Sequence, residues 1–192
     1  MKKDIILAGV GGQGIVSIAA TIGYAAVSEN LFFKQSEVHG MSQRGGAVQS
    51  HFRLSDKEIF SDLIPMGKAD IIISVEPMEA LRYLPWLSKD GWLVTNTEPF
   101  INIPDYPPME NIISELSKLK NVVALNADKI AKELKTSKSA NMVVLGAASP
   151  YLDINFNTLE NAIGILFGKK GEKIVEDNVR ALKAGVEFSK LK

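Results

Sequence analysis

The sequence predicts an α/β fold of the Rossmann type, in which helices flank a mostly parallel sheet. Short apolar runs alternate with segments of helical periodicity. A glycine cluster stands between the first apolar run and the first helical segment, as in folds that bind ligands at the start of a helix. The size of 192 residues, of which 46% are hydrophobic and 23% charged, suits one globular domain with a sizeable core. We therefore interpret residues 1–192 as a single domain.

The first strand is expected at residues 4–8, an apolar run of the kind found in strands that are buried on both faces. Apolar side chains then recur at helical spacing through residues 15–26. The apolar residues 31–33 complete a strand–helix–strand unit of about 30 residues, the size of a parallel crossover. These residues predict the first half of a parallel sheet.

The middle of the chain supplies further strands. Residues 47–54 alternate between apolar and polar side chains, which predicts a half-exposed strand with Gln49, His51 and Arg53 on its polar side. A helix is expected to begin near Pro77, and a proline-rich stretch covers residues 99–108. Three short apolar runs add central strands, at residues 70–75, 92–95 and 122–125.

The C-terminal part is predicted to be helical. Asn157, with Glu160 three positions later, resembles a helix N-cap and its capping partner. Residues 142–148 are apolar on every side, which indicates a helix enclosed by protein. Enclosure within the same domain and a subunit contact both explain that pattern. The last helix carries one apolar stripe, made of Ile174, Val175, Val179, Leu182 and Val186.

Composition excludes several functions. Lysine plus arginine equals aspartate plus glutamate at 22 each, so no overall field attracts nucleic acid or an anionic membrane. The chain has no cysteine, and thiolates are the usual ligands of iron–sulfur clusters. Two histidines are too few for an ordinary zinc site, so we expect no resident metal. Without a signal peptide or a long apolar run, a cytoplasmic location is expected.

The cluster Gly9-Val10-Gly11-Gly12-Gln13-Gly14 has glycines at positions one, three and six of the dinucleotide-binding fingerprint. Glycines allow a tight turn, and the free N–H groups at a helix start can hold a phosphate. The fingerprint also requires an acidic residue at the end of the second strand, where this chain has residues 34–36 without one and Glu37 beyond the expected end. Three interpretations follow: nicotinamide binding, glycines that only serve packing, and a site for an anion or for a cofactor shared with another subunit. The missing acid favours the third.

A second polar cluster, Glu37-Val38-His39-Gly40-Met41-Ser42-Gln43-Arg44-Gly45-Gly46, follows the second expected strand. Ligands of open α/β sheets lie near such positions. Arg44 could present its guanidinium to a carboxylate or phosphate, and His39 could titrate near neutrality. The alternative is a polar loop whose side chains satisfy the chain's own backbone and carboxylates.

Taken together, these clusters and residues 51–53 resemble the gamma-type domain of 2-oxoacid:ferredoxin oxidoreductases. Within that family the resemblance is greatest to the beta subunits of indolepyruvate enzymes. It continues through residues 70–73, Glu76-Pro77 and Asn96 to Asn141 and residues 145–147. The decapeptide Glu-Val-His-Gly-Met-Ser-Gln-Arg-Gly-Gly at 37–46 is the specific part, because a glycine loop alone is a weak signal.

The resemblance implies a subunit that works with a larger alpha subunit holding thiamine diphosphate, magnesium and iron–sulfur clusters. The implied reaction is oxidative decarboxylation of an aryl 2-oxoacid, with coenzyme A capturing the acyl group and ferredoxin receiving electrons through the complex. A homodimer is a further expected association. His39 and Arg44 are expected to orient an anionic substrate or coenzyme A. The expected cofactor-binding residues are Gly9, Gly11, Gly12, Gln13, Gly14, Ser42, Gln43, Gly45 and Gly46.

Two other classes of protein are also compatible with the sequence. A stand-alone nicotinamide-dependent reductase would bind NADH or NADPH without a partner. A non-catalytic scaffold would tolerate changes at His39 and Arg44 but not in residues 142–148. The missing acid argues against the reductase, and the concentration of polar groups at residues 37–44 argues against the scaffold.

Overall fold

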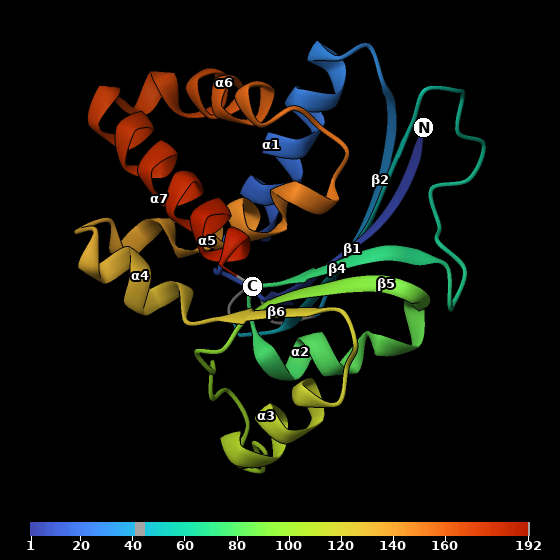
Figure 1. Ribbon diagram of the computed structural model, residues 1–192, viewed down its shortest axis with the longest axis vertical. Helices are drawn as coiled ribbons and strands as arrows, with labels where there is room; N and C mark the ends of the chain where they lie inside the picture. The colour runs from blue at the N-terminus through green and yellow to red at the C-terminus, as the bar shows by residue number, and fades with distance from the viewer. Residues whose placement is uncertain (41–44, 192) are drawn as a thin grey trace.

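A six-stranded sheet forms the centre of the computed structural model, in the order β2-β3-β1-β4-β5-β6 (Figure 1). The structure describes residues 1–40 and 45–191. Neighbouring strands pair in parallel from β1 through β4 and β5 to β6, so the predicted mostly parallel α/β sheet is confirmed. The strands are β1 (Lys2–Val10), β2 (Phe32–His39), β3 (Ala47–Ser55), β4 (Ala69–Ser74), β5 (Leu87–Asn96) and β6 (Val122–Leu125).

Helices cover both faces of the sheet. In Figure 1, α1, α5, α6 and α7 lie on one face, with α4 beside them, whereas α2 and α3 lie on the other face. The helices are α1 (Ile15–Ser28), α2 (Pro77–Arg82), α3 (Met109–Ser117), α4 (Ala127–Glu133), α5 (Ala140–Ala148), α6 (Phe156–Phe167) and α7 (Glu172–Lys190). Short 3₁₀ turns are η1 (Leu84–Trp86), η2 (Ser137–Ser139), η3 (Ser149–Tyr151) and η4 (Gly168–Lys170). The helical C-terminal part is confirmed, and α3 and α4 are helices that the sequence analysis did not predict.

The first strand–helix–strand unit differs from the expected one. Strands β1 and β2 run in the same direction, but β3 lies between them and is antiparallel to both. Moreover, β2 extends to His39, so Glu37 and His39 belong to the strand and do not follow it. The strand predicted at residues 31–33 is present from Phe32 but continues to His39, because polar side chains can occupy an edge strand, where apolar runs are not required.

The strand predicted at residues 47–54 is confirmed as β3, but the prediction that it is half-exposed is wrong. The alternation itself is present, since Phe52 and Leu54 belong to the core on the α1 side. The polar side is covered as well, and His51 is only 8% exposed. The segment that follows β3 folds back over this side, where the Ile64 N–H donates to His51 Nδ1 at 3.0 Å.

The helix α5 is enclosed by its own domain, which is one of the two explanations for its apolar pattern. Residues 142–148 are all buried, mainly against α7. A Cβ added at Gly146 would lie 2.0 Å from the Leu182 carbonyl oxygen, and one added at Gly185 would lie 2.0 Å from that of Val143. The two helices therefore pack backbone against backbone, which only glycine permits at these positions.

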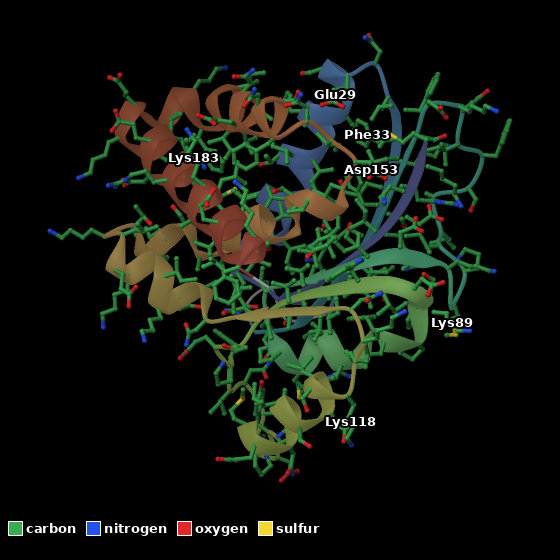
Figure 2. The ribbon with its side chains drawn as sticks, viewed as in Figure 1. Glu29, Phe33, Lys89, Lys118, Asp153 and Lys183 are labelled. Atoms are coloured by element: carbon green, nitrogen blue, oxygen red, sulfur yellow. The ribbon has the colours of Figure 1, made fainter. Side chains whose placement is uncertain are left out.

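The start of α6 corrects another expectation. Asn155 is the N-cap, and its side chain accepts a hydrogen bond from Asn157 N at 2.9 Å. Glu160 does not cap the helix but pairs with Lys183 at 2.7 Å. Figure 2 labels Lys183 on α7, the helix that packs beside α6. Among the residues that the structure describes, no helix is long and apolar enough to cross a membrane.

Candidate functional site

The glycine loop joins β1 to α1 at the carboxyl edge of the parallel strands. Gly12 and Gly14 have φ angles of +99° and +84°, in the left-handed region that favours glycine. A Cβ at Gly14 would lie 2.5 Å from Asn141 Nδ2, whereas one at Gly12 would have nothing within 4 Å. Gly14 thus serves close packing, and Gly12 faces open space that another molecule can approach.

The side chain of Gln13 braces this loop. Its Oε1 accepts from Val10 N at 2.8 Å, and its Nε2 donates to Val75 O at 3.4 Å. These bonds tie the ends of β1 and β4 together. Gln13 lies at the predicted site, but its amide is engaged within the chain.

The end of the second polar cluster lies directly against the glycine loop. Gly11 N donates to Gly46 O at 2.8 Å, and Gly45 N donates to Gly11 O at 3.3 Å. Two segments that the sequence analysis singled out separately therefore form one structure. The intervening Met41, Ser42, Gln43 and Arg44 lie outside the described residues.

Two adjoining depressions, of about 420 and 370 Å³, open beside Gly12. Asn141 and Lys138 line both depressions. Asn141 Nδ2 donates to Gly14 O at 3.1 Å, so the start of α5 supports the start of α1. The larger depression is bordered by the ends of β4 and β5, and Asp128 lines it as well. Ser17 and Lys170 line the smaller one.

The family model for pyruvate ferredoxin/flavodoxin oxidoreductase matches residues 4–188. The chain belongs to this family. Indolepyruvate oxidoreductase subunit IorB of Archaeoglobus fulgidus is 36% identical over an alignment of 192 positions. The alignment covers 96% of this chain and 94% of that protein. The resemblance found in the sequence is thereby confirmed.

Solved structures of the family share the fold. The 2-oxoglutarate:ferredoxin oxidoreductase from Magnetococcus marinus, with 2-oxoglutarate, coenzyme A and succinyl-CoA bound, matches with a TM-score of 0.78 and 25% identity. That match covers 100% of this chain but 31% of the other, so this chain spans about a third of that protein's length. The gamma subunit of a keto/oxoacid ferredoxin oxidoreductase from Geobacter sulfurreducens PCA matches with a TM-score of 0.72 and 23% identity, over 99% of both chains.

His39 does not line either of the two depressions. It ends the edge strand β2, and β3 separates it from β1. Its side chain is 55% exposed and pairs through Nε2 with Glu37 Oε1 at 2.5 Å. The structure does not bring His39 to Gly12, and its predicted orienting role remains a prediction.

Asn96, one of the residues that carry the resemblance, connects the carboxyl ends of three strands. Its Nδ2 donates to Val75 O at 3.3 Å and to Asp128 Oδ2 at 2.8 Å. Its Oδ1 accepts from Ala127 N at 2.9 Å, at the start of α4. Asn96 is 3% exposed, so this buried network is a structural support for the loops around the site.

The residues that face the glycine loop from later in the chain were not predicted from the sequence. Asn141 entered only as part of the resemblance, and Lys138 and Asp128 were not named. A single lysine or asparagine between two helices carries no spacing signal. Only the fold shows that η2 and the start of α5 lie opposite Gly12.

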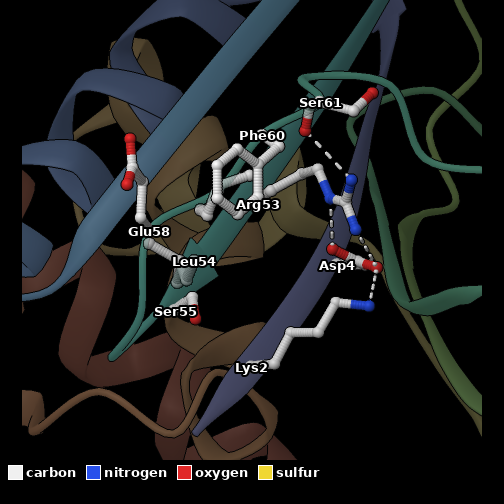
Figure 3. Close-up of a pocket in the computed structure, with 9 residues that line it drawn as sticks. Lys2, Asp4, Arg53, Leu54, Ser55, Glu58, Phe60 and Ser61 are labelled. Atoms are coloured by element: carbon white, nitrogen blue, oxygen red, sulfur yellow. Dashed lines mark hydrogen bonds and ion pairs between the residues drawn. The ribbon is translucent and has the colours of Figure 1, made fainter.

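A third depression, of about 320 Å³, lies at the opposite edge, where β1 begins (Figure 3). Arg53 forms two bonds with the buried Asp4, from Nε to Oδ1 at 2.7 Å and from Nη2 to Oδ2 at 3.1 Å. Its Nη1 donates to the carbonyls of Ser61 and Leu63 at 3.0 and 3.1 Å. Every nitrogen of this guanidinium is thus used within the chain. The ion pair links β3 to β1, and the two bonds from Nη1 hold the segment after β3, so this guanidinium has a structural role.

Proposed function

We propose that this chain is the small subunit of a 2-oxoacid:ferredoxin oxidoreductase that acts on an aryl 2-oxoacid such as indolepyruvate. The observation that carries the proposal is the junction of the glycine loop with Gly45 and Gly46, beside two depressions that Lys138 lines. The full-length similarity to an indolepyruvate oxidoreductase subunit supports this substrate class. The proposed reaction converts the 2-oxoacid and coenzyme A into acyl-coenzyme A, CO₂ and a proton, with two electrons passing to ferredoxin.

The described part of this chain lacks the side chains that would hold the iron–sulfur clusters and the metal ion of the proposed reaction. Iron–sulfur clusters need thiolates, and the sequence has no cysteine. Among the described residues, no three histidine or acidic side chains come together to hold a metal ion. We therefore assign thiamine diphosphate, magnesium and the clusters to a larger partner subunit.

The contribution proposed for this chain is to bind and orient an anion. N–H groups at the start of a helix favour negative charge, and the open space at Gly12 gives a phosphate access to the start of α1. Lys138 adds a positive charge on the opposite wall. We propose that these groups bind phosphates of coenzyme A, while Arg44 and His39 orient it or the 2-oxoacid at the junction with the partner.

The nicotinamide alternative loses its geometric basis in this fold. The ribose-binding acid of the dinucleotide site stands at the end of a strand beside the first strand. Here β3 takes that place, and it reaches the glycine loop through Gly46 and Ala47. Glu37 lies on β2, one strand farther away.

The direct test is to purify the chain from its native source together with its companion polypeptide. We expect a complex with visible absorbance that contains thiamine diphosphate and reduces ferredoxin with indolepyruvate and coenzyme A. The isolated chain should be inactive and regain activity when the partner is added. A colourless complex without thiamine diphosphate, or NADH binding by the chain alone, would contradict the proposal.

Substitution of Arg44 tests the orienting role within that complex. Arg44→Ala should raise the KM for coenzyme A or for the 2-oxoacid, because a guanidinium that binds an anion is lost. Normal assembly with unchanged kinetic constants would leave the family assignment intact and remove Arg44 from the site. If the chain is only a scaffold, substitution of His39 should also leave assembly and the kinetic constants unchanged.

A further inference from the structure

The proline-rich segment 97–108, between β5 and α3, is exposed along most of its length. Ile101 is 72% exposed and Phe100 is 41% exposed, so burial of apolar surface fixes the segment only near its end, where Tyr106 packs partly buried against the core. Hydrogen bonds from the neighbouring loops hold the rest. These bonds lead from the buried end of β4 to the glycine loop.

Glu76 provides the first anchor. It follows β4 and is fully buried. Its Oε2 accepts from Glu79 N at 2.8 Å and caps α2, which leaves Oε1 for the proline-rich segment. Oε1 accepts from Phe100 N at 3.3 Å and from the Tyr106 hydroxyl. One buried carboxylate therefore fixes both ends of residues 100–106.

The hydroxyl of Tyr106 is suited to this bond. Burial raises its pKa, and the hydrogen bond to Glu76 raises it further, so the phenol keeps its proton over the physiological range. A phenol donating to a carboxylate is a charge-assisted hydrogen bond, which is stronger than a neutral one.

Asn102 extends this support to the site. It lies between the two ends fixed by Glu76, and its Nδ2 donates to Gly45 O at 2.5 Å. Gly45 has φ +79° and is itself bonded to Gly11 O. The chain of contacts thus runs from Glu76 through the proline-rich segment to the turn that lies against the glycine loop.

We propose that Glu76, Tyr106 and Asn102 are positioning residues, which hold the Gly45–Gly46 turn against Gly11 and so keep the proposed anion site formed. A fully buried carboxylate is costly unless its bonds are made, and here two of its three bonds serve a segment whose side chains mostly face solvent. Such an arrangement stabilises a loop position and contributes little to the core. The ligand named for the site rests on the proposed function, whereas the positioning of the turn does not.

Asn102→Asp tests the last contact. The new side chain has nearly the same size but replaces the donor with an acceptor facing the Gly45 carbonyl. Hydrogen exchange of the full chain should increase about fivefold in peptides that contain residues 45–46 and 97–108, because one hydrogen bond of order 1 kcal/mol is lost. Tyr106→Phe should accelerate exchange in the second peptide and, less strongly, in the first. The melting temperature of Asn102→Asp should stay near that of the unchanged chain, because Asn102 is exposed. Tyr106→Phe should lower it, because the buried carboxylate of Glu76 loses a donor.

Kinetics of the chain assembled with its partner distinguish positioning from general stability. We expect Asn102→Asp to raise the KM for coenzyme A about three- to tenfold while kcat stays within twofold, and Asn102→Gln, which keeps a donor, to recover part of the loss. Matched controls are Asn161→Asp and Tyr24→Phe, at exposed positions on α6 and α1.

The outcomes separate the two proposals. Equal exchange at residues 45–46 in Asn102→Asp, the control and the unchanged chain would overturn the positioning role. Faster exchange with an unchanged KM in a complex that requires coenzyme A would leave Asn102 holding the turn and would overturn the claim that this turn keeps the coenzyme A site formed. If the unchanged complex turns over without coenzyme A, the proposed function fails, and the exchange comparison still decides whether Asn102 holds the turn.

Discussion

Glycine has opposite uses in two regions of this molecule. In the helical layer, Gly146 and Gly185 let α5 and α7 touch through their backbones, with no room for a methyl group. At the carboxyl edge of the sheet, Gly12 adopts a left-handed conformation and leaves open space around itself. The first region is held by apolar and backbone contact, and the second by buried polar side chains that support loops. The helical layer should therefore determine stability, and the loop edge should determine binding.

The largest expected effect is in the helical layer. Gly185→Ala places a methyl group 2.0 Å from the Val143 carbonyl oxygen, so α7 must move away from α5. We expect the free energy of unfolding to fall by more than about 4 kcal/mol, or the chain not to fold, as measured by urea denaturation.

Gly164→Ala is the matched control for that substitution. Gly164 lies within α6, and a Cβ there would have nothing within 4 Å. Alanine should stabilise this helix by up to about 1 kcal/mol. Similar losses at Gly164 and Gly185 would mean that the close approach of α5 and α7 is not what stabilises the layer.

The next effect concerns the polar support of the loop edge. Asn96→Ala leaves Ala127 N and Asp128 without this partner and removes one of the two side-chain donors to the Val75 carbonyl, which keeps the bond from Gln13. We expect a loss of about 2–3 kcal/mol in the free energy of unfolding, from buried groups left unsatisfied. Asn161→Ala, at an exposed position, should change it by less than about 0.5 kcal/mol. An equal effect at both positions would remove Asn96 from the support of the loops.

These two regions also differ in how much the sequence predicts. The run at residues 122–125 and the glycine loop are visible because their signals are local: an apolar stretch, and glycines between a strand and a helix. The contact of Gly146 with Gly185 joins residues distant in sequence, and no periodic pattern in the sequence predicts it. The apolar pattern of residues 142–148 predicts that the helix is enclosed but not which helix encloses it.

The order of the strands is another feature that local patterns do not contain. The alternation of residues 47–54 is real, but it does not show that β3 enters between β1 and β2. The same insertion separates His39 from Gly12, although Gly45 and Gly46 of the same polar cluster lie against the glycine loop. Lys138 comes to the glycine loop only through the packing of α5, which explains why the sequence analysis did not name it.

A smaller effect on stability is expected at the open glycine. Gly12→Ala forces a left-handed conformation on alanine, which costs about 1–2 kcal/mol, without a clash. Under the proposed function the methyl group also fills the space that a phosphate uses, so the KM for coenzyme A should rise about tenfold in the assembled enzyme. Gly67→Ala is the control, because Gly67 has φ +69° and equally open surroundings at the other edge of the sheet. It should lose similar stability and keep the KM; a raised KM in both variants would attribute the effect to strain alone.

The smallest effect tests whether buried polar supports make the loops sensitive to pH. His51 supports the segment after β3 by accepting from Ile64 N, and its ring meets Trp86 edge-on. Burial lowers the pKa of His51 below its ordinary value of 6.5; nearby Asp62 partly offsets this shift, and Arg53 adds to it. The unfolded chain therefore binds the proton more readily than the folded chain. Stability due to His51 is fully present above pH 6.5 and declines as the pH falls through that value towards the lower folded pKa.

His51→Asn should remove this dependence while its amide oxygen still accepts from Ile64. Between pH 7.5 and 5.5, the unchanged chain should lose up to about 1 kcal/mol more unfolding free energy than His51→Asn loses. The difference between the two curves isolates the histidine, because both proteins share the same carboxylates. Urea denaturation at intervals across that range measures it, and parallel curves would show that His51 keeps one protonation behaviour in the folded and unfolded chains. If the two curves instead converge as the pH falls, the segment after β3, unlike the α5–α7 contact, is stabilised by His51 as a neutral acceptor.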